Sequence, residues 1–258
     1  MKDRLGHKFS KDARVGLFIP CYIDQFYPNV ARACLELLEK QGLKIDYPMN
    51  QTCCRQPMAN SECEHFSTKV YKNMVGTFSH CDFIVTPSRS CTYHIRHHYN
   101  TIAQTPEVEK VRSRTYEFVH FLTEILAVNE MPVSFPYRVG LHLGCHGQRG
   151  LNNAKLSEVA VARGGELLRI LQTIKDIGLT TLDRYDECCG FGGTFCVSEE
   201  AVSSRMGVDR LSDHIRNGAE VLTGADMSCL MHLDGLVKRR KLDISVMHVA
   251  EILNGARP

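Results

Sequence analysis

The chain has 258 residues, of which 43% are hydrophobic and 23% are charged, and its formal net charge is +2. This composition excludes an intrinsically disordered chain, and the near-neutral charge excludes a protein that follows a nucleic-acid backbone with a broad basic face. We expect the one short basic run, KRRK at residues 238–241, to be a solvated loop.

Neither end of the chain nor its interior has the pattern of a membrane or secreted protein. No uninterrupted apolar run approaches the roughly 18 residues that a membrane span needs. The N-terminal segment MKDRLGHKFSKDARVG lacks the apolar stretch of a signal peptide. We therefore expect a cytoplasmic protein, and twelve cysteines in a reducing compartment indicate metal or redox chemistry rather than disulfides.

The first half of the chain alternates strand-like runs with helical patterns. VGLFIPC, at residues 15–21, precedes a helix predicted over residues 30–43, in which Gly42 supplies the C-cap. The short segment LKID, a helix around residues 61–80 and the strand-like run DFIVTP follow in order. A helix ending in Glu-Ile-Leu closes this half, and the breaker-rich stretch NEMPVSFP at residues 129–136 is the predicted linker.

The second half repeats this order. VGLHLGC at residues 139–145 is followed by a helix predicted over residues 165–179 with Gly178 as its cap, and then by LTTLD. A helix over residues 199–217, the run AEVLTG and a second helix ending in Glu-Ile-Leu complete it. Alternating strands and helices predict an α/β fold of two pseudo-symmetric Rossmann-like halves, residues 1–132 and 133–258, each with a small parallel sheet flanked by helices.

Cysteines occupy matching places in the two halves. One follows the first strand, an adjacent pair follows the next short segment, and a fourth follows the later strand. These candidate ligands are Cys21, Cys53, Cys54 and Cys91 in the first half and Cys145, Cys188, Cys189 and Cys229 in the second. Because ligands collect beyond the carboxyl ends of parallel strands, we expect the four thiols of each half to converge on one edge of its sheet.

Four thiolates can hold either zinc or an iron-sulfur cluster. Zinc ribbons normally use two C-x-x-C pairs, which neither half contains, whereas adjacent cysteines diverge and suit a larger inorganic core. In the second half Gly190, Gly192 and Gly193 let the backbone approach such a core and direct amide N–H groups at it. The pattern favours a 4Fe-4S cluster in the second half and leaves zinc open.

Several further cysteines and histidines are weaker candidates. Cys34 and Cys63 are expected to pack as small hydrophobes inside helices, with Cys81 similar at a helix end. Cys196, in the glycine-rich loop, is a candidate extra ligand. His94 and His232, three residues after a candidate ligand, are secondary candidates. The histidines expected to be structural are His97, His98, His142 and His146.

The order of a strand-end cysteine, a Cys-Cys pair and a later cysteine, with CCGFGGTF in the second half, resembles the duplicated cysteine-rich (CCG) domain family. That family includes a component of heterodisulfide reductase and iron-sulfur components of glycolate and glycerol-3-phosphate oxidases. The resemblance covers about residues 15–253 and implies that the eight matching cysteines are metal ligands. For the branch that serves lactate utilization, it implies an iron-sulfur protein that acts with a ferredoxin-like subunit and a third subunit in oxidising L-lactate to pyruvate.

The sequence departs from the family pattern in two places. His94 and His232 stand where the fullest pattern has a fifth cysteine, which puts five-cysteine sites in doubt. The first half has CCRQP in place of Cys-Cys-Gly, so zinc, a different cluster and an empty site all stay open there.

No flavin fingerprint or nucleotide-binding lysine-serine loop is present, and one-electron clusters alone do not remove two electrons and two protons from lactate. We therefore predict a non-flavin, electron-transferring component of an oxidoreductase complex rather than a complete enzyme. Two alternatives remain open, namely a zinc-stabilised interaction scaffold and a subunit that performs heterodisulfide-type thiol chemistry at its cluster.

Overall fold

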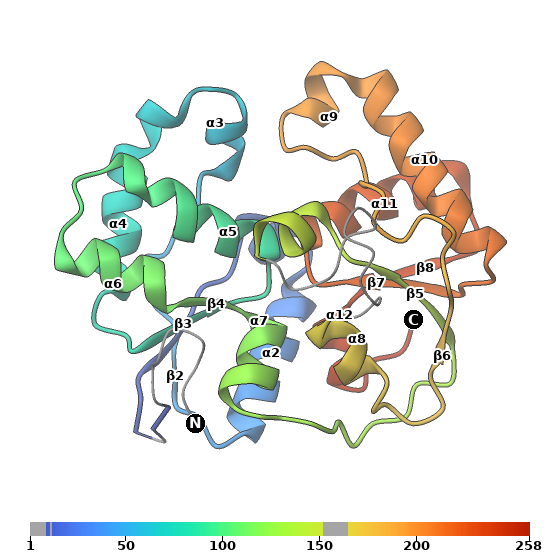
Figure 1. Cartoon of the computed structure of the whole chain (residues 1–258), viewed down its shortest axis with the longest axis horizontal. Coiled ribbons are helices and arrows are strands. Elements are labelled where there is room, and N and C mark those ends of the chain that lie inside the picture. The colour runs from blue at the N-terminus through green and yellow to red at the C-terminus, as the bar shows by residue number, and fades with distance from the viewer. Residues whose placement is uncertain (1–8, 11, 152–164) are drawn as a thin grey trace. The chain divides into compact units, whose positions relative to one another are not determined.

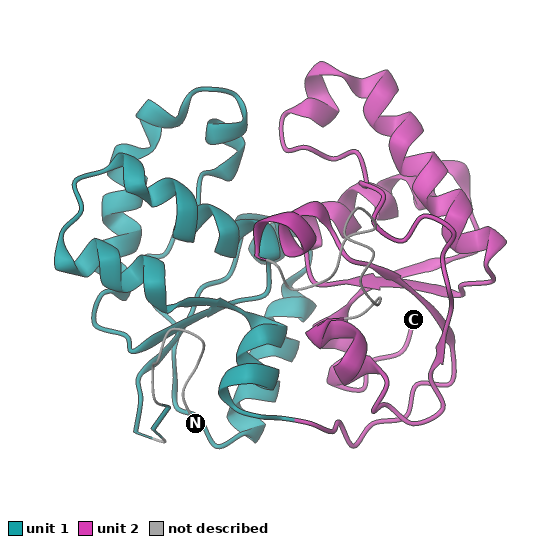
Figure 2. Ribbon diagram, viewed as in Figure 1, with its two compact units in different colours: residues 1–128 teal, residues 129–258 magenta. Residues whose placement is uncertain are grey.

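The computed structural model describes residues 9–10, 12–151 and 165–258. The chain forms two compact units, residues 1–128 and 129–258 (Figure 2). Each unit contains one four-stranded parallel sheet with helices around it (Figure 1). The predicted α/β class with two pseudo-symmetric halves is confirmed.

The first unit has its strands in the order β2-β1-β3-β4. They are β1 (Val15–Leu17), β2 (Ile45–Asp46), β3 (Phe83–Thr86) and β4 (Thr115–Glu117). The helical elements are α1 (Cys21–Phe26), α2 (Pro28–Lys40), α3 (Gln56–Asn60), η1 (Glu64–Ser67), α4 (Thr68–Phe78), α5 (Arg89–His98), η2 (Tyr99–Thr101), α6 (Pro106–Arg114), α7 (Phe118–His120) and η3 (Phe121–Ile125).

The second unit has the same topology, with the strand order β6-β5-β7-β8. Its strands are β5 (Arg138–His142), β6 (Gly178–Leu179), β7 (Val221–Gly224) and β8 (Ser245–His248). The described helical elements are η4 (His146–Gly150), α8 (Glu166–Leu171), α9 (Phe195–Ser198), α10 (Glu200–Arg216), α11 (Met227–Arg240) and α12 (Val249–Leu253).

This strand order creates a topological switch point in each sheet. In the first unit the chain leaves β1 toward β2 on one side, while β3 pairs with β1 on the other side. In the second unit β5 lies between β6 and β7 in the same way. Crevices outside the carboxyl ends of strands at such points are the usual ligand sites of open α/β sheets.

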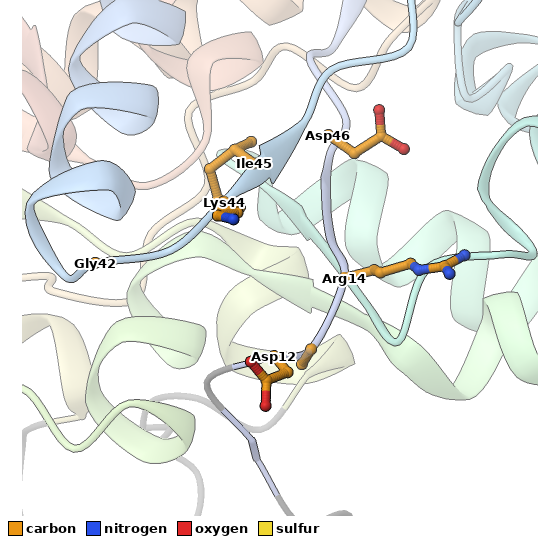
Figure 3. Close-up of a pocket in the computed structure, with 7 residues that line it drawn as sticks. Asp12, Arg14, Gly42, Lys44, Ile45 and Asp46 are labelled. Atoms are coloured by element: carbon orange, nitrogen blue, oxygen red, sulfur yellow. The ribbon is translucent and has the colours of Figure 1, made fainter.

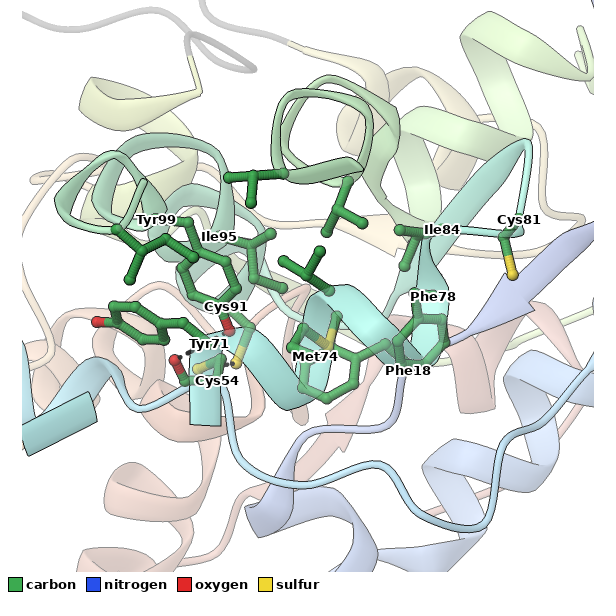
Figure 4. Packing of buried hydrophobic residues seen from close by; sticks show 14 residues of the cluster. Phe18, Cys54, Tyr71, Met74, Phe78, Cys81, Ile84, Cys91, Ile95 and Tyr99 are labelled. Atoms are coloured by element: carbon green, nitrogen blue, oxygen red, sulfur yellow. Dashed lines mark hydrogen bonds between the residues drawn. The ribbon is translucent and has the colours of Figure 1, made fainter. Parts of the chain in front are cut away.

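The core of the first unit covers both faces of its sheet, as parallel strands require. An apolar cluster on one face joins Phe18 and Ile84 to side chains of α4, α5 and α6 (Figure 4). Phe83, the residue before Ile84 in β3, packs instead against Phe121, with ring centroids 5.6 Å apart. Two of the candidate ligands, Cys54 and Cys91, belong to the first cluster, so their thiols lie at the margin of a low-dielectric core.

In the second unit a buried carboxylate on α10, paired with a buried arginine of the same helix, holds the chain segment before the second Cys-Cys pair. The side chains of Arg210 and Asp213 are fully buried, and their charged atoms lie 3.5 Å apart. The Asp213 carboxylate also accepts hydrogen bonds from the backbone N–H groups of Asp183 at 3.1 Å and Arg184 at 3.0 Å. Losing either partner would leave an uncompensated buried charge. The pair therefore keeps the Asp213 carboxylate in place to hold residues 183 and 184.

Most predicted elements are present. Residues 30–43 correspond to α2, which Gly42 follows with a positive φ of 78°, and residues 199–217 correspond to α10. LKID contributes β2, and the runs at residues 82–87 and 219–224 form β3 and β7. Among the described residues, no helix is both long and apolar enough to cross a membrane.

The helix predicted over residues 165–179 is wrong beyond Leu171. Lys175 donates its N–H to the carbonyl of Val133 at 3.0 Å and accepts from Phe135 at 2.9 Å. Pairing with the linker thus overrides the helical periodicity. Gly178 is consequently not a helix cap but the first residue of β6, and most of LTTLD lies beyond that strand.

Two other local predictions are wrong. The helix expected around residues 61–80 begins only at Thr68, so Cys63 lies outside it and is half-buried. The basic run at residues 238–241 is exposed, but it forms the last turn and cap of α11 instead of a loop. Cationic side chains are favourable at a helix C-terminus, which explains the helical state.

Gly140→Ala tests how closely α10 packs on the second sheet. A Cβ at Gly140 would overlap the buried His214 ring and lie 3.0 Å from the Cβ of Ala219. We expect overpacking to lower the free energy of unfolding by about 1–3 kcal/mol. Gly235→Ala, on exposed α11 surface with no neighbour within 4 Å, is the control and should stabilise by up to about 1 kcal/mol. Denaturant unfolding of both variants measures this, and equal stabilities would contradict the packing.

Candidate metal centre

Four thiols meet at the carboxyl end of the first sheet. Cys21 follows β1 as the first residue of α1, and Cys91 follows β3 in the first turn of α5. The Sγ atoms of Cys21 and Cys53 are 3.5 Å apart. Those of Cys54 and Cys91, drawn in Figure 4, are 3.2 Å apart. The adjacent cysteines therefore turn toward different partners, and all four candidate ligands of this half lie together.

The second unit repeats this arrangement. The thiols of Cys145, Cys188 and Cys189 lie close enough to shift one another's pKa. The Sγ atoms of Cys189 and Cys229 lie within 4.8 Å of each other. Cys145 follows β5 and Cys229 lies in the first turn of α11. The four candidate ligands of this half thus form a row of sulfurs at the same sheet edge as in the first unit.

In both rows the neighbouring thiols lower the pKa of the first cysteine of the adjacent pair. Hydrogen bonds from Cys21 and Cys54 lower the pKa of the Cys53 thiol to about 2. Hydrogen bonds from Cys145 and Cys189 likewise lower the pKa of Cys188 to about 2. The thiolate is the form that binds metals, so a lowered pKa at this position favours metal binding.

The turn after each Cys-Cys pair directs backbone N–H groups at sulfur. The N–H of Arg55 donates to Cys53 Sγ at 3.3 Å, and that of Gly190 donates to Cys188 Sγ at 3.4 Å. Arg55 has a φ of 72° and Gly190 a φ of 87°, so both residues adopt the left-handed conformation. The first half therefore keeps the turn of the family pattern although an arginine replaces its glycine, at a cost of about 1–2 kcal/mol.

The glycines of the second turn are required by close packing. A Cβ at Gly190 would lie 2.6 Å from the carbonyl oxygen of Ser203 and 2.7 Å from the Cβ of Met206, both on α10. A Cβ at Gly192 would lie 2.7 Å from the Cβ of Phe195. Gly193 also has a positive φ, of 69°. The turn that follows the second Cys-Cys pair therefore depends on its glycines.

Helix N-termini add favourable electrostatics to the two centres. Cys91 is the third residue of the ten-residue helix α5, and its N–H donates to the side chain of Ser88 at 3.2 Å. Cys229 has the same place in the longer helix α11. The positive end of a helix dipole stabilises a thiolate or an anionic cluster beside it.

His142 lies among the thiols of the second unit, although it was expected to be structural. One of its ring nitrogens and the Sγ atoms of Cys189 and Cys229 all lie within 4.8 Å of one another. The sequence contained a signal for this position, because the repeat aligns His142 with Phe18 at the end of the first strand.

His94 and His232 bind protein groups through their Nε2 atoms. Nε2 of His94 is hydrogen-bonded to the hydroxyl of Tyr71 at 2.9 Å. Nε2 of His232 lies 3.3 Å from the carbonyl oxygen of Ser203, to which it donates. Neither histidine belongs to the group of donors that contains His142, Cys189 and Cys229.

The remaining candidate cysteines have other surroundings. Cys196 donates its thiol proton to the carbonyl of Gly193 at 3.1 Å. Cys34 is fully buried in α2, as expected. Cys81 is buried too, but its Sγ lies 3.5 Å from Nε2 of His80.

Two hollows lie on the first unit. A cavity of about 490 Å³ adjoins Cys21 and Cys53, with Gln51 also in its wall. Another, of about 550 Å³, is lined by Arg14, Lys44 and Asp46 (Figure 3). Arg14 precedes β1 whereas Cys21 follows it, so the second hollow lies toward the amino end of β1, away from the thiols.

The donor set fits a metal centre in each unit. Both units have four thiols and backbone N–H groups directed at sulfur, and the second also has a glycine-rich turn; these are features that proteins use to hold iron-sulfur clusters. Four thiols alone also suit zinc. The grouping of His142, Cys189 and Cys229 is a further set with metal-binding character.

Two repeats of one α/β unit, each with four thiols at its switch point, define a duplicated cysteine-rich protein. The model of the cysteine-rich (CCG) domain matches residues 15–96 and again residues 139–234, and the chain belongs to this family. The resemblance seen in the cysteine pattern is thereby confirmed.

Similar proteins over nearly the whole chain carry a more specific name than the domain family does. The chain is 36% identical to lactate utilization protein A of Bacillus subtilis over 245 residues, which are 93% of this chain and 99% of that protein. It is 38% identical to lactate utilization protein A of Geobacillus thermodenitrificans over 246 residues, covering 93% and 98% of the two chains.

Among solved structures, a hypothetical protein from Helicobacter pylori has the same fold. Its TM-score is 0.60 at 12% identity, and the match covers 94% of this chain and 48% of that one. At this identity the likeness concerns the fold alone.

Replacing the residue after each Cys-Cys pair tests the two turns. Arg55→Gly should retain the metal of the first unit and gain up to about 1–2 kcal/mol of stability, because glycine adopts a left-handed φ without strain. Gly190→Ala should lose metal from the second unit, because its Cβ meets α10. Metal content and thermal unfolding measure both effects, and full metal retention in Gly190→Ala would contradict this account.

Proposed function

We propose that this protein is an iron-sulfur subunit that transfers electrons in the oxidation of L-lactate to pyruvate. The observation that carries the proposal is the row of four thiols, with N–H donors directed at the first cysteine of each pair, at the switch point of each sheet. The substrate is inferred from the relatives, which are named for lactate utilization and align over nearly the whole chain.

In the second unit, the residues that would hold a 4Fe-4S cluster are Cys145, Cys188, Cys189 and Cys229. Gly190, Gly192 and Gly193 would let the backbone approach it, and amide hydrogen bonds to sulfur raise the potential of such a cluster. In the first unit, Cys21, Cys53, Cys54 and Cys91 would hold a cluster or zinc. A bound 4Fe-4S cluster supplies one-electron transfer.

We infer that the protein acts within a complex. Oxidation of lactate removes two electrons and two protons, and one-electron clusters alone do not perform that step. A ferredoxin-like iron-sulfur subunit and a third subunit are the partners implied by the family resemblance. In this arrangement the chain relays electrons, and the dehydrogenation itself takes place on another subunit.

One observation favours a second candidate, a zinc-stabilised interaction scaffold. The Sγ–Sγ distances of 3.5 and 3.2 Å in the first unit are close to the spacing of about 3.7 Å that we estimate for thiolates on one tetrahedral zinc. A zinc scaffold has no redox chemistry. Identifying the metal and any sulfide in the sites therefore distinguishes the scaffold from the electron-transfer subunit.

Metal and acid-labile sulfide analysis of anaerobically purified protein tests the proposal. We expect about four irons and four sulfides per cluster, with an absorption band near 400 nm that dithionite bleaches. Cys188→Ser and Cys189→Ser should each remove most iron from the second unit, because each deletes a ligand. Cys34→Ser is the matched control, since this buried thiol in α2 lies outside both rows, and it should keep its iron.

Two other outcomes would contradict the proposed function or the ligand assignment. Zinc without sulfide, and no chromophore after anaerobic reconstitution, would replace the electron-transfer proposal with the scaffold. Equal iron loss in Cys34→Ser and Cys188→Ser would show that the ligand assignment is wrong.

A further inference from the structure

We propose that His142 is a metal ligand in the second unit, so that this centre has a nitrogen donor in addition to its thiolates. The inference rests on the proposed function in taking the row of cysteines as ligands. It goes beyond that function because it makes the two centres of the chain chemically different.

The position of His142 places it in the site. It is the last residue of β5, one of the two strands that flank the switch point, and its side chain is 2% exposed. A ring nitrogen lies within 4.8 Å of the Sγ atoms of both Cys189 and Cys229, which also lie within that distance of each other. Three donors converging from β5, the Cys-Cys turn and α11 lie close enough to ligate one metal centre with modest movement.

The backbone that carries His142 is held close to the neighbouring strand. His142 pairs with Gly224 of β7, and a Cβ at Gly224 would lie 2.7 Å from the carbonyl oxygen of His142. The imidazole therefore projects from a fixed point at the sheet edge. Imidazole is a good ligand for iron and zinc, and replacing thiolate by neutral imidazole raises the potential of an iron-sulfur centre.

The first unit provides the internal comparison. There the repeat has Phe18, which is fully buried and packs edge-to-face on Phe78 with ring centroids 6.0 Å apart. A phenyl ring offers no donor atom, so this position adds no ligand to the first centre. The same strand end thus carries a nitrogen donor in one unit and a core side chain in the other.

His232 is the other histidine to consider in the second unit. It stands where the fullest family pattern has a fifth cysteine, but its Nε2 faces the carbonyl oxygen of Ser203 at 3.3 Å. The group of donors within 4.8 Å of one another contains His142 and omits His232. The structure therefore favours His142 as the nitrogen donor.

Pulsed electron paramagnetic resonance of the dithionite-reduced protein tests this assignment. A Cys53→Ser, Cys54→Ser background removes the first centre, so that the signal comes from the second. We expect the strong ¹⁴N coupling of a directly bound nitrogen, distinct from the weak couplings of amides hydrogen-bonded to sulfur. His142→Phe, which installs the residue found at this place in the first unit, should abolish the strong coupling, whereas His232→Gln should keep it.

The outcomes separate this inference from the proposed function. Iron and sulfide without a strong ¹⁴N coupling, or a coupling that survives in His142→Phe, overturn the assignment of His142 and leave the electron-transfer proposal standing. If His142→Phe does not fold, His142→Gln replaces it in the same measurement.

Zinc without sulfide would reject the proposed function, and the inference is then tested on cobalt(II)-substituted protein in the same background. Visible d–d bands that shift to the position of an all-sulfur site in His142→Phe would support nitrogen ligation. Identical spectra of the two proteins would overturn it, as would a second unit that binds no metal at all.

Discussion

Four sulfurs must meet at one edge of each sheet, and much of the structure follows from that constraint. The switch point brings the ends of two neighbouring strands together, and a cysteine follows each of them. The adjacent pair supplies the other two sulfurs, and its first member collects the hydrogen bonds of its neighbours. The helices that carry the later cysteines in their first turns direct their positive ends to the same place.

The two units share one backbone arrangement around the sulfurs but differ in the side chains found there. The left-handed residue after the pair is Arg55 in one unit and Gly190 in the other, where a Cβ would meet α10. The residue at the end of the first strand is Phe18 in one and His142 in the other. Shared geometry therefore does not imply shared chemistry, because the residues around the sulfurs set the charge and the donor atoms of each site.

The features that could be predicted from the sequence are those that depend on local pattern and on the repeat. Strand runs, the helix α10 and the grouping of cysteines follow from periodicity and from the rule that ligands gather at the carboxyl ends of parallel strands. The end of α8 could not be predicted, because Lys175 pairs with linker residues far away in the chain. His142 was missed because a single histidine in a strand does not show which side chains lie near it in the fold, although the repeat aligns it with Phe18.

Each sheet is built only from strands of its own unit, β1 to β4 in the first and β5 to β8 in the second. Every candidate ligand of the first unit lies between residues 21 and 91, and its last strand ends at Glu117. Domains generally fold as units during synthesis, starting from the N-terminus. We therefore expect the first set of thiols to come together before the second, so that the order of translation sets the order in which the two groups of thiols form.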